Sequence, residues 1–420
     1  MKPKIIFLLL SMLITSGVFS QESYPRYILD TLCSPDMHGR GYYEKGDSLA
    51  ADFIAAEYKN IELSAFKTDF FQQFTLPANS IEGKLSLIVN KKEFVPGEDF
   101  IVSPASPPID GSFKVKKVDP DLITDFNRFK KFLFTCKGEI LWIESDKIED
   151  KGQLHQITRG LQFSPKLPIA GIITTSSDSL IYTASQEQAH YPLWQINARS
   201  ISEIPKKVSV HIESTHYDKY TSQNVIGYIE GEVKDSFVCV TAHYDHLGRM
   251  GKDVYFPGAN DNASGTAMLL SIAKEFSTIK PKYTLVFMAF GAEEIGLVGS
   301  KYYVDNPYFP LSNIRFLINL DILGTGDDGI QIVNSAIYSK QYERIKSINE
   351  KGKLLKQIKI RGERCNSDHC FFYEKGVPSF FIYTLGGVAH YHNIYDKSET
   401  LPLTEFEDLK SLLIEFISKF

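Results

Sequence analysis

Apolar and polar residues follow two different patterns along this chain, one on each side of about residue 206. Beyond it, short apolar runs occur at 224–228, 236–242, 283–290, 316–320 and 379–383. Between them lie segments with helical spacing of apolar residues, such as Ala267, Leu270, Ala273 and Phe276. Strands that alternate with helices predict an α/β fold, in which helices cover both faces of a mainly parallel, twisted sheet.

The first half of the chain contains two helix-like runs and then a region of shorter runs. The helix-like runs cover residues 24–32 and 47–59. From residue 76 to 205, short alternating runs are separated by Pro, Gly, Asn and Asp, which is typical of strands and turns. We therefore expect a β-rich insert that shapes or covers a site formed by the rest of the chain.

The last stretch of the chain predicts a helix that packs on the sheet. Its apolar stripe consists of Phe406, Leu409, Leu413, Phe416 and Phe420. Thr404, with Glu407 three residues later, has the spacing of a capping box, in which each side chain accepts a backbone N–H at the start of a helix. We expect the helix to begin there.

The first twenty residues differ in character from the remainder. Lys2 and Lys4 precede an apolar run from 5 to 19, which ends in small residues. This pattern predicts a cleaved signal peptide and a secreted or periplasmic protein; the run is short for a membrane anchor, which is the alternative. The 420 residues then divide into a signal peptide (1–20), a first part of the α/β domain (21–75), the insert (76–205) and the main part of the α/β domain (206–420).

Composition and charge narrow the classes of partner. The formal net charge is −5, with 46 basic and 51 acidic residues, and no basic patch stands out. Nucleic acid and membrane surfaces are therefore not expected partners. The five cysteines do not form a disulfide scaffold. Cys365 and Cys370 are close enough in sequence to pair in an oxidising compartment, and two free thiols are the alternative. Nothing indicates an oligomeric state.

Titratable residues gather directly after the apolar runs. They are His243, Asp245, Asp261, Glu293, Glu294 and Asp321. Sites in open α/β sheets form beyond the carboxyl ends of the strands, so we expect these groups to meet. Singly they have ordinary explanations, such as a helix N-cap for Asp261. Glu293 and Glu294, however, lie between a strongly apolar strand and G-L-V-G-S, a poor place for a solvated pair.

Imidazole and carboxylate groups together suit a hydrolytic metal site. Such a site needs neutral imidazole and carboxylate ligands, an open position for water, and a base. Two neighbouring metals also need a carboxylate that bridges them. Zinc suits this set best, although cobalt or manganese could fit the same ligands.

The combined motifs resemble the co-catalytic zinc aminopeptidases, a family that includes bacterial leucyl aminopeptidase, aminopeptidase Y and the glutamate carboxypeptidase-like enzymes. In order, the motifs are H-Y-D, G-A-N-D-N-A-S-G, A-E-E-I-G-L-V-G-S, N-L-D and Y-H-N-I-Y-D. The match covers about residues 209–420, with a weaker one at S-P-D-M-H-G-R-G. The resemblance implies the phosphorylase/hydrolase-like fold of zinc peptidases. The insert is similar to a protease-associated domain in position and β-rich character.

The resemblance also implies a metal-binding role for five residues. His243 and Asp321 would bind one metal, and Glu294 and His392 the other. Asp261 would bridge the two. The implied cofactor is therefore two Zn²⁺ ions per chain, and the implied partners are peptide substrates.

Three further residues receive catalytic roles from the resemblance. Glu293 would be the general base that takes a proton from water and passes it to the leaving amine. Asp245 would hold the His243 ring. Tyr391 precedes His392, as a tyrosine does in the carboxypeptidase-like branch, and would donate to the oxyanion.

The late histidine needs a separate argument, because His390 is two residues from His392. On an extended stretch both would point to one side, so side-chain direction does not choose between them. The spacing to Asp396 matches the family's late histidine followed by x-x-x-D and favours His392. We expect His246 to be a loop residue, and the S-D-H of 367–369 to line the site or brace the sheet.

The leading hypothesis is a secreted or periplasmic metallo-aminopeptidase, an enzyme that hydrolyses the N-terminal bond of peptides. A carboxypeptidase would need basic groups for substrate carboxylates, and Arg40, Arg249 and Arg364 are candidates. A glutaminyl cyclase fits less well, because those relatives work with one zinc. A receptor-like binding protein that has lost its metals fits least, because all five ligands and the base are present.

Overall fold

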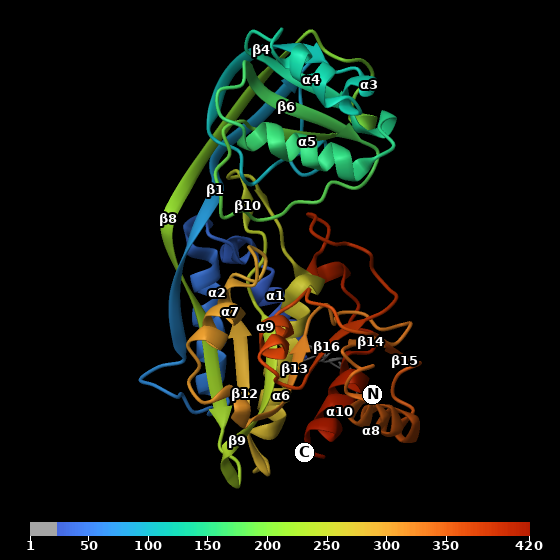
Figure 1. Ribbon diagram of the computed structural model, residues 1–420. Coiled ribbons are helices and arrows are strands. Elements are labelled where there is room, and N and C mark those ends of the chain that lie inside the picture. The colour runs from blue at the N-terminus through green and yellow to red at the C-terminus, as the bar shows by residue number, and fades with distance from the viewer. Residues whose placement is uncertain (1–22) are drawn as a thin grey trace, which may run out of the picture.

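Two long strands join the two parts of the molecule (Figure 1). β1 (Phe71–Val89) and β8 (Lys207–Ile229) pair antiparallel along most of their length. The computed structural model describes residues 23–420, so the expected signal peptide lies outside the described residues. One end of the β1–β8 pair belongs to the α/β domain and the other to the insert, which lies at the top of Figure 1.

The α/β domain is built on one twisted sheet with the strand order β15-β14-β16-β13-β9-β12-β8. Neighbours among β16, β13, β9 and β12 are parallel, and so are β14 and β15. β14 runs antiparallel to β16, and β8 runs antiparallel to β12. The strands beyond β8 are β9 (Val233–His243), β12 (Tyr283–Phe290), β13 (Ile314–Leu320), β14 (Ile330–Val333), β15 (Ile358–Ile360) and β16 (Ser379–Thr384). The predicted α/β fold is confirmed.

Helices cover both faces of this sheet because its strands alternate apolar residues to the two sides. In β9, Val238 and Val240 pack in one core with α1, α2, α6, α8 and α10, whereas Cys239 packs in the other with α7 and α9. The helices are α1 (Tyr24–Leu32), α2 (Gly46–Asn60), α6 (Ser264–Phe276), α7 (Val298–Asp305), α8 (Ser339–Gly352), α9 (His369–Glu374) and α10 (Phe406–Ile417). No helix within residues 23–420 is long and apolar enough to cross a membrane.

The predicted start of the terminal helix is wrong in detail. The N-cap residue of α10 is Glu405, and no side chain caps the helix. The Thr404 hydroxyl instead donates to Asp327 Oδ2 at 3.3 Å. The expected stripe is correct, because Phe406, Leu409 and the other apolar positions of the helix pack in the core. Burial therefore positions this helix without a capping box.

The insert continues the sheet beyond β8 and contains helices that the alternating pattern did not predict. Its strands follow the order β8-β4-β5-β6-β7-β3, with parallel pairs from β4 to β7. They are β3 (Phe100–Val102), β4 (Ile109–Lys117), β5 (Glu139–Glu144), β6 (Ile169–Ser176) and β7 (Leu193–Asn197). The helices are α3 (Pro120–Ile123), α4 (Phe126–Leu133) and α5 (Lys151–Phe163). The short strands β2 (Lys92–Glu93) and β10 (Arg249–Met250) pair with β1, and β11 (Val254–Tyr255) pairs with β10.

Candidate metal centre

Four neighbouring parallel strands bring the sequence-predicted residues to one edge of the sheet. His243 is the last residue of β9, and Asp321 directly follows β13. Glu293 and Glu294 lie in the loop after β12, and His392 lies in the loop after β16. Because these strands are adjacent and parallel, their carboxyl ends meet, as the strand-end argument predicted.

Asp261 lies in the turn that leads into α6, and backbone hydrogen bonds hold this turn in place. The Asp396 carboxylate accepts from the backbone N–H of Asn260 at 2.9 Å and of Asp261 at 3.1 Å. The side chain of Asn262 donates to the carbonyl of Leu320, the last residue of β13, at 3.0 Å. The carboxylate of Asp261 therefore lies between the two histidines.

One end of the cluster, which we call the His243 half-site, consists of His243, Asp321 and the Oδ1 side of Asp261. His243 Nε2 lies 3.4 Å from Asp261 Oδ1 and 3.5 Å from Asp321 Oδ1. Ser367 donates from its hydroxyl to Asp321 Oδ2 at 2.7 Å and accepts from Asn319 Nδ2 at 2.8 Å. Through Ser367, the S-D-H motif thus braces the carboxylate of Asp321 and bonds to β13, which fits both expected roles, lining the site and bracing the sheet.

The other end, the His392 half-site, consists of His392, Glu294 and the Oδ2 side of Asp261. His392 Nε2 lies 3.1 Å from Asp261 Oδ2 and 3.1 Å from Glu294 Oε2. His390 is exposed and lies against the ring of Tyr395 instead. The structure therefore places His392, and not His390, in the cluster.

His246 is a site residue that the sequence analysis missed. It lies in a loop, as expected, but it is buried there and its Nδ1 lies 2.7 Å from Glu294 Oε1. Its ring centroid lies 5.8 Å from that of His392. Since His392 contacts the other oxygen of Glu294, we interpret His246 as the residue that orients this carboxylate. The signal in the sequence was a second histidine directly after H-Y-D.

The donor set fits two divalent metal ions. Ligand atoms of His243, Asp261 and Asp321 lie within 4.8 Å of one another, and His392 Nε2 lies 3.1 Å from an oxygen of Asp261 and of Glu294. Asp321 Oδ1 and His392 Nε2 are buried and make no hydrogen bond to another described residue. Buried polar atoms without partners are costly in a folded protein, and one cation in each half-site would satisfy the atom that lies there.

Burial and neighbouring side chains shift the pKa values of two carboxyl groups in the site in opposite directions. Burial acts to raise the pKa of Asp261, but the neighbouring imidazoles of His243 and His392 outweigh it and hold the pKa below its usual range. Burial raises the pKa of Glu293 well above its usual value, against the lowering effect of His243. The carboxylate of Asp261 therefore stays charged, which suits a metal ligand. Glu293, in contrast, binds a proton readily.

Asp245 supports the site in a different way from the one predicted. Its carboxylate accepts from the backbone N–H of Glu293 at 3.0 Å and of Glu294 at 3.2 Å. His243 Nδ1 lies 3.8 Å from this carboxylate and hydrogen-bonds the backbone carbonyl of Asp245 at 3.2 Å. Asp245 thus positions the glutamate loop with its side chain and the His243 ring with its backbone.

Tyr391 lies at the rim of the site. Its side chain is half-exposed, and its ring stacks on that of His392 with a centroid distance of 3.8 Å. Burial and the neighbouring carboxylates Asp261 and Glu294 raise the pKa of its phenol. The phenol therefore keeps its proton and is a hydrogen-bond donor, but its action on an oxyanion stays a prediction.

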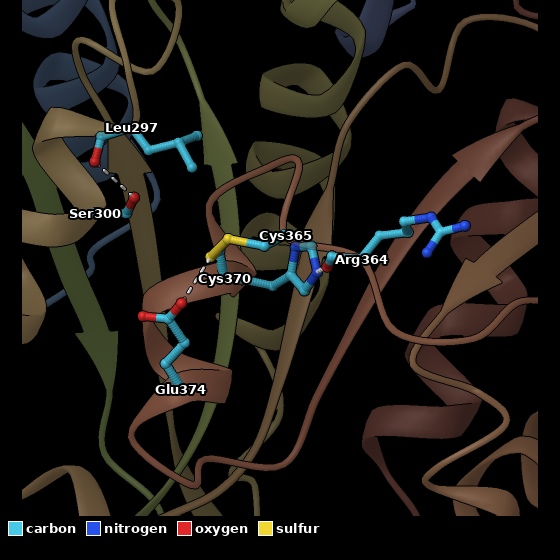
Figure 2. The surroundings of a disulfide bond; sticks show 7 residues. Leu297, Ser300, Arg364, Cys365, Cys370 and Glu374 are labelled. Atoms are coloured by element: carbon cyan, nitrogen blue, oxygen red, sulfur yellow. Dashed lines mark hydrogen bonds between the residues drawn. A yellow bond between two sulfur atoms is a disulfide. The ribbon is translucent and has the colours of Figure 1, made fainter.

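The three arginines considered for a substrate carboxylate are engaged elsewhere. Arg40 is fully buried and donates to backbone carbonyls, including those of Tyr244 and Gly258 at 2.7 Å each. Arg249 donates to the Lys252 carbonyl at 2.7 Å. Arg364 is exposed and points away from the neighbouring disulfide (Figure 2). Within residues 23–420, no lysine or arginine forms an ion pair with a carboxylate of either half-site.

A disulfide brackets the motif that braces Asp321. Cys365 and Cys370 are joined, and Figure 2 shows Glu374 beside the sulfur atoms. This resolves the alternative that the sequence left open. Ser367, Asp368 and His369 lie between the two cysteines and are fully buried.

A known protein family matches the part of the chain that carries both half-sites. The model described as peptidase family M28 matches residues 224–417, which include every residue of both half-sites. The chain carries a peptidase family M28 domain. This agrees with the resemblance to co-catalytic zinc aminopeptidases that the motifs indicated.

Curated relatives of this M28 domain are peptidases by name. The chain is 28% identical to "Aminopeptidase YwaD" of Bacillus subtilis over 260 residues, which cover 60% of this chain and 54% of the relative. It is 36% identical to a "Probable zinc metalloprotease" of Pyricularia oryzae over 111 residues, 25% of this chain and 22% of the relative. The matches thus span about half of the first relative and less of the second.

Solved structures extend the similarity of fold over both parts of the molecule. A zinc aminopeptidase from Bacillus subtilis superposes with a TM-score of 0.71 at 21% identity, over 94% of each chain. A peptidase M28 precursor from Shewanella amazonensis gives a TM-score of 0.68 at 16% identity, over 94% of this chain and 92% of the other. The insert and the α/β domain therefore occur together in proteins of known structure.

Proposed function

We propose that this chain is a zinc aminopeptidase, an exopeptidase that uses two zinc ions to hydrolyse the N-terminal bond of peptides. The observation that carries the proposal is the pair of histidine–carboxylate half-sites that share Asp261. His243 and Asp321 would hold one ion, and His392 and Glu294 the other. When bound, zinc would act as a Lewis acid that polarises the scissile carbonyl and favours deprotonation of water.

Glu293 is the group in this site best suited to move a proton. Its side chain is mostly buried, and its Oε2 lies 4.0 Å from His243 Nε2. The raised pKa of Glu293 favours the protonated form that must later donate to the leaving amine. In this proposal Glu293 takes a proton from the attacking water and delivers it to the amine nitrogen.

The charge of the site favours a substrate amine over a substrate carboxylate. Six carboxyl groups surround it, including those of Asp245 and Asp368, and none is paired with a lysine or arginine among the described residues. A peptide with a free N-terminus therefore suits this lining better than one recognised by its C-terminal carboxylate.

We also propose that the protein acts outside the cytoplasm, in the periplasm or after secretion. The basic and apolar start of the chain supports this location. The disulfide between Cys365 and Cys370 is of the kind that persists in oxidising compartments. A reporter fusion assayed in periplasmic and culture fractions tests this location.

The test of the activity combines metal analysis with one substitution. Purified protein is expected to hold two zinc ions and to cleave aminoacyl nitroanilides, but not their N-acetylated forms. Glu293→Gln should keep both ions and lose about a hundredfold to ten-thousandfold in kcat, the usual contribution of a general base. Full turnover by Glu293→Gln would show that Glu293 is not the general base. Cleavage of N-acetylated peptides from the C-terminus would instead favour the carboxypeptidase.

A further inference from the structure

A segment of the insert enters the His392 half-site. Residues 180–189, between β6 and β7, have no regular secondary structure, and we call them the bridging segment. Gln186 donates from Nε2 to the carbonyl of Ile295 at 2.8 Å, directly after Glu294. Ser185 accepts from the backbone N–H of Asn79 at 2.8 Å. The segment is thus tethered to β1 and to the glutamate loop of the α/β domain.

The backbone of Tyr182 in this segment makes two hydrogen bonds with His392, one to its backbone and one to its side chain. Its N–H donates to the carbonyl of His392 at 2.9 Å, and its carbonyl accepts from His392 Nδ1 at 3.1 Å. A carbonyl oxygen only accepts hydrogen bonds, so Nδ1 carries a proton. The lone pair of a neutral His392 ring then lies on Nε2, which faces Asp261 and Glu294. The insert therefore sets both the tautomer and the direction of this imidazole.

The backbone of His392 also needs outside support. Its φ of 52° lies in the left-handed region, which residues with a side chain adopt at a cost. Such conformations persist when the surrounding structure holds them. The pair with Tyr182 supplies this, because the Tyr182 ring is itself buried and stacks on Phe256, with centroids 4.6 Å apart. Phe256 belongs to the α/β domain, so Tyr182 is anchored there.

The two histidines differ in this respect. His243 Nδ1 finds its partner two residues away, on the carbonyl of Asp245, whereas His392 Nδ1 finds its partner on Tyr182, 210 positions away in the insert. We propose that the bridging segment is a working part of the His392 half-site, with Tyr182 as a positioning residue for His392. The inference rests on the proposed function, because it assigns the insert to one of the two zinc ions.

The test measures the two zinc affinities separately in the full-length protein, by competition with a chelator. Tyr182→Ala removes the stacked ring that anchors the segment. The substitution should lower the affinity for one zinc ion by about tenfold to a hundredfold, as loss of a group that supports a metal ligand usually does. The affinity for the other ion should not change. Tyr182→Phe, which keeps the ring, should bind both ions with wild-type affinity. In the His392→Ala background, Tyr182→Ala should have no further effect on the remaining ion.

A second variant keeps the proposal falsifiable if Tyr182→Ala folds poorly. Gln186→Ala removes one neutral hydrogen bond next to Glu294. It should lower the affinity for the same zinc ion by about fivefold. With cobalt in place of zinc, both variants should alter the visible absorption of one ion only. Equal weakening of both ions, or no change in either, would overturn the role of the segment. A wild-type protein that binds no zinc would overturn the proposed function instead.

Discussion

The two half-sites share Asp261 but are supported by different parts of the molecule. The His243 half-site is held by neighbouring strands, since Asp321 binds Ser367, which binds Asn319 of β13, which accepts from Thr241 of β9. The His392 half-site is held by loops, through His246 on one side and Tyr182 of the insert on the other. One half-site is therefore part of the sheet, and the other depends on how two domains meet.

This difference has a consequence for metal binding. Ligands on adjacent strands keep their geometry because the hydrogen bonds of the sheet hold the strand ends together. The loop that carries His392 rises from the end of β16 towards the insert (Figure 1), where Tyr182 meets it. We expect the two ions to differ in affinity, with the weaker one in the His392 half-site.

The largest effect is expected from the residue that the half-sites share. Asp261→Asn keeps the shape of the side chain but removes the charge that both ions need. Both zinc affinities should fall by more than about a hundredfold, beyond the loss of a merely supporting group, and hydrolysis should become undetectable. Metal analysis after dialysis checks this, with circular dichroism to show that the fold remains. Asp235→Asn, at an exposed position, is the matched control.

Removal of either histidine should separate the half-sites. His243→Ala and His392→Ala should each retain one zinc ion, because each removes a ligand from one half-site only. The ion retained by His392→Ala should keep its wild-type affinity, since strands hold the His243 half-site. His38→Ala is the control, because His38 pairs with Glu44 at 3.2 Å, outside the cluster. Retention of two ions by His392→Ala would remove His392 from the ligand set, and His246→Ala would then be the next variant.

The sequence indicated much of the strand-supported half-site and less of the loop-supported one. His243 and Asp321 end apolar strands, and the carboxyl ends of parallel strands meet in a way that a local pattern can predict. The stretch around His392 has no periodicity, so its conformation depends on distant contacts. Only the resemblance to a family favoured His392 over His390.

The supporting residues could not be predicted for a related reason. Both hydrogen bonds between Tyr182 and His392 use backbone atoms of Tyr182, and a backbone contact does not restrict the residue type at position 182. The helices of the insert were missed because their surroundings read as strands and turns, and the Asp150 N-cap of α5 was overlooked. His246 was visible, but a lone histidine in a loop has no feature that indicates its partner.

A smaller effect is expected from the brace of the His243 half-site. Ser367→Ala removes the hydroxyl that donates to Asp321 Oδ2, so one zinc affinity should fall by about tenfold. The effect should be the same in the His392→Ala background, because the two changes act on different ions. Ser335→Ala is the matched control, since that buried hydroxyl bonds the Ile332 carbonyl at 2.6 Å, outside the cluster. If Ser367→Ala weakens the second ion as well, the half-sites are not supported separately.

The smallest effect on metal binding is expected from the disulfide. A bond between residues five apart constrains little of the unfolded chain, so the double variant Cys365→Ser, Cys370→Ser should lose about 2 kcal/mol of stability by the loop-entropy model. The zinc affinity of the His243 half-site should change by less than about threefold, because Ser367 keeps its hydrogen bonds to Asp321 and Asn319. Thermal melts and chelator competition check both numbers. A loss of zinc as large as that of Ser367→Ala would mean that the disulfide, and not the burial of 367–369, holds the brace in place.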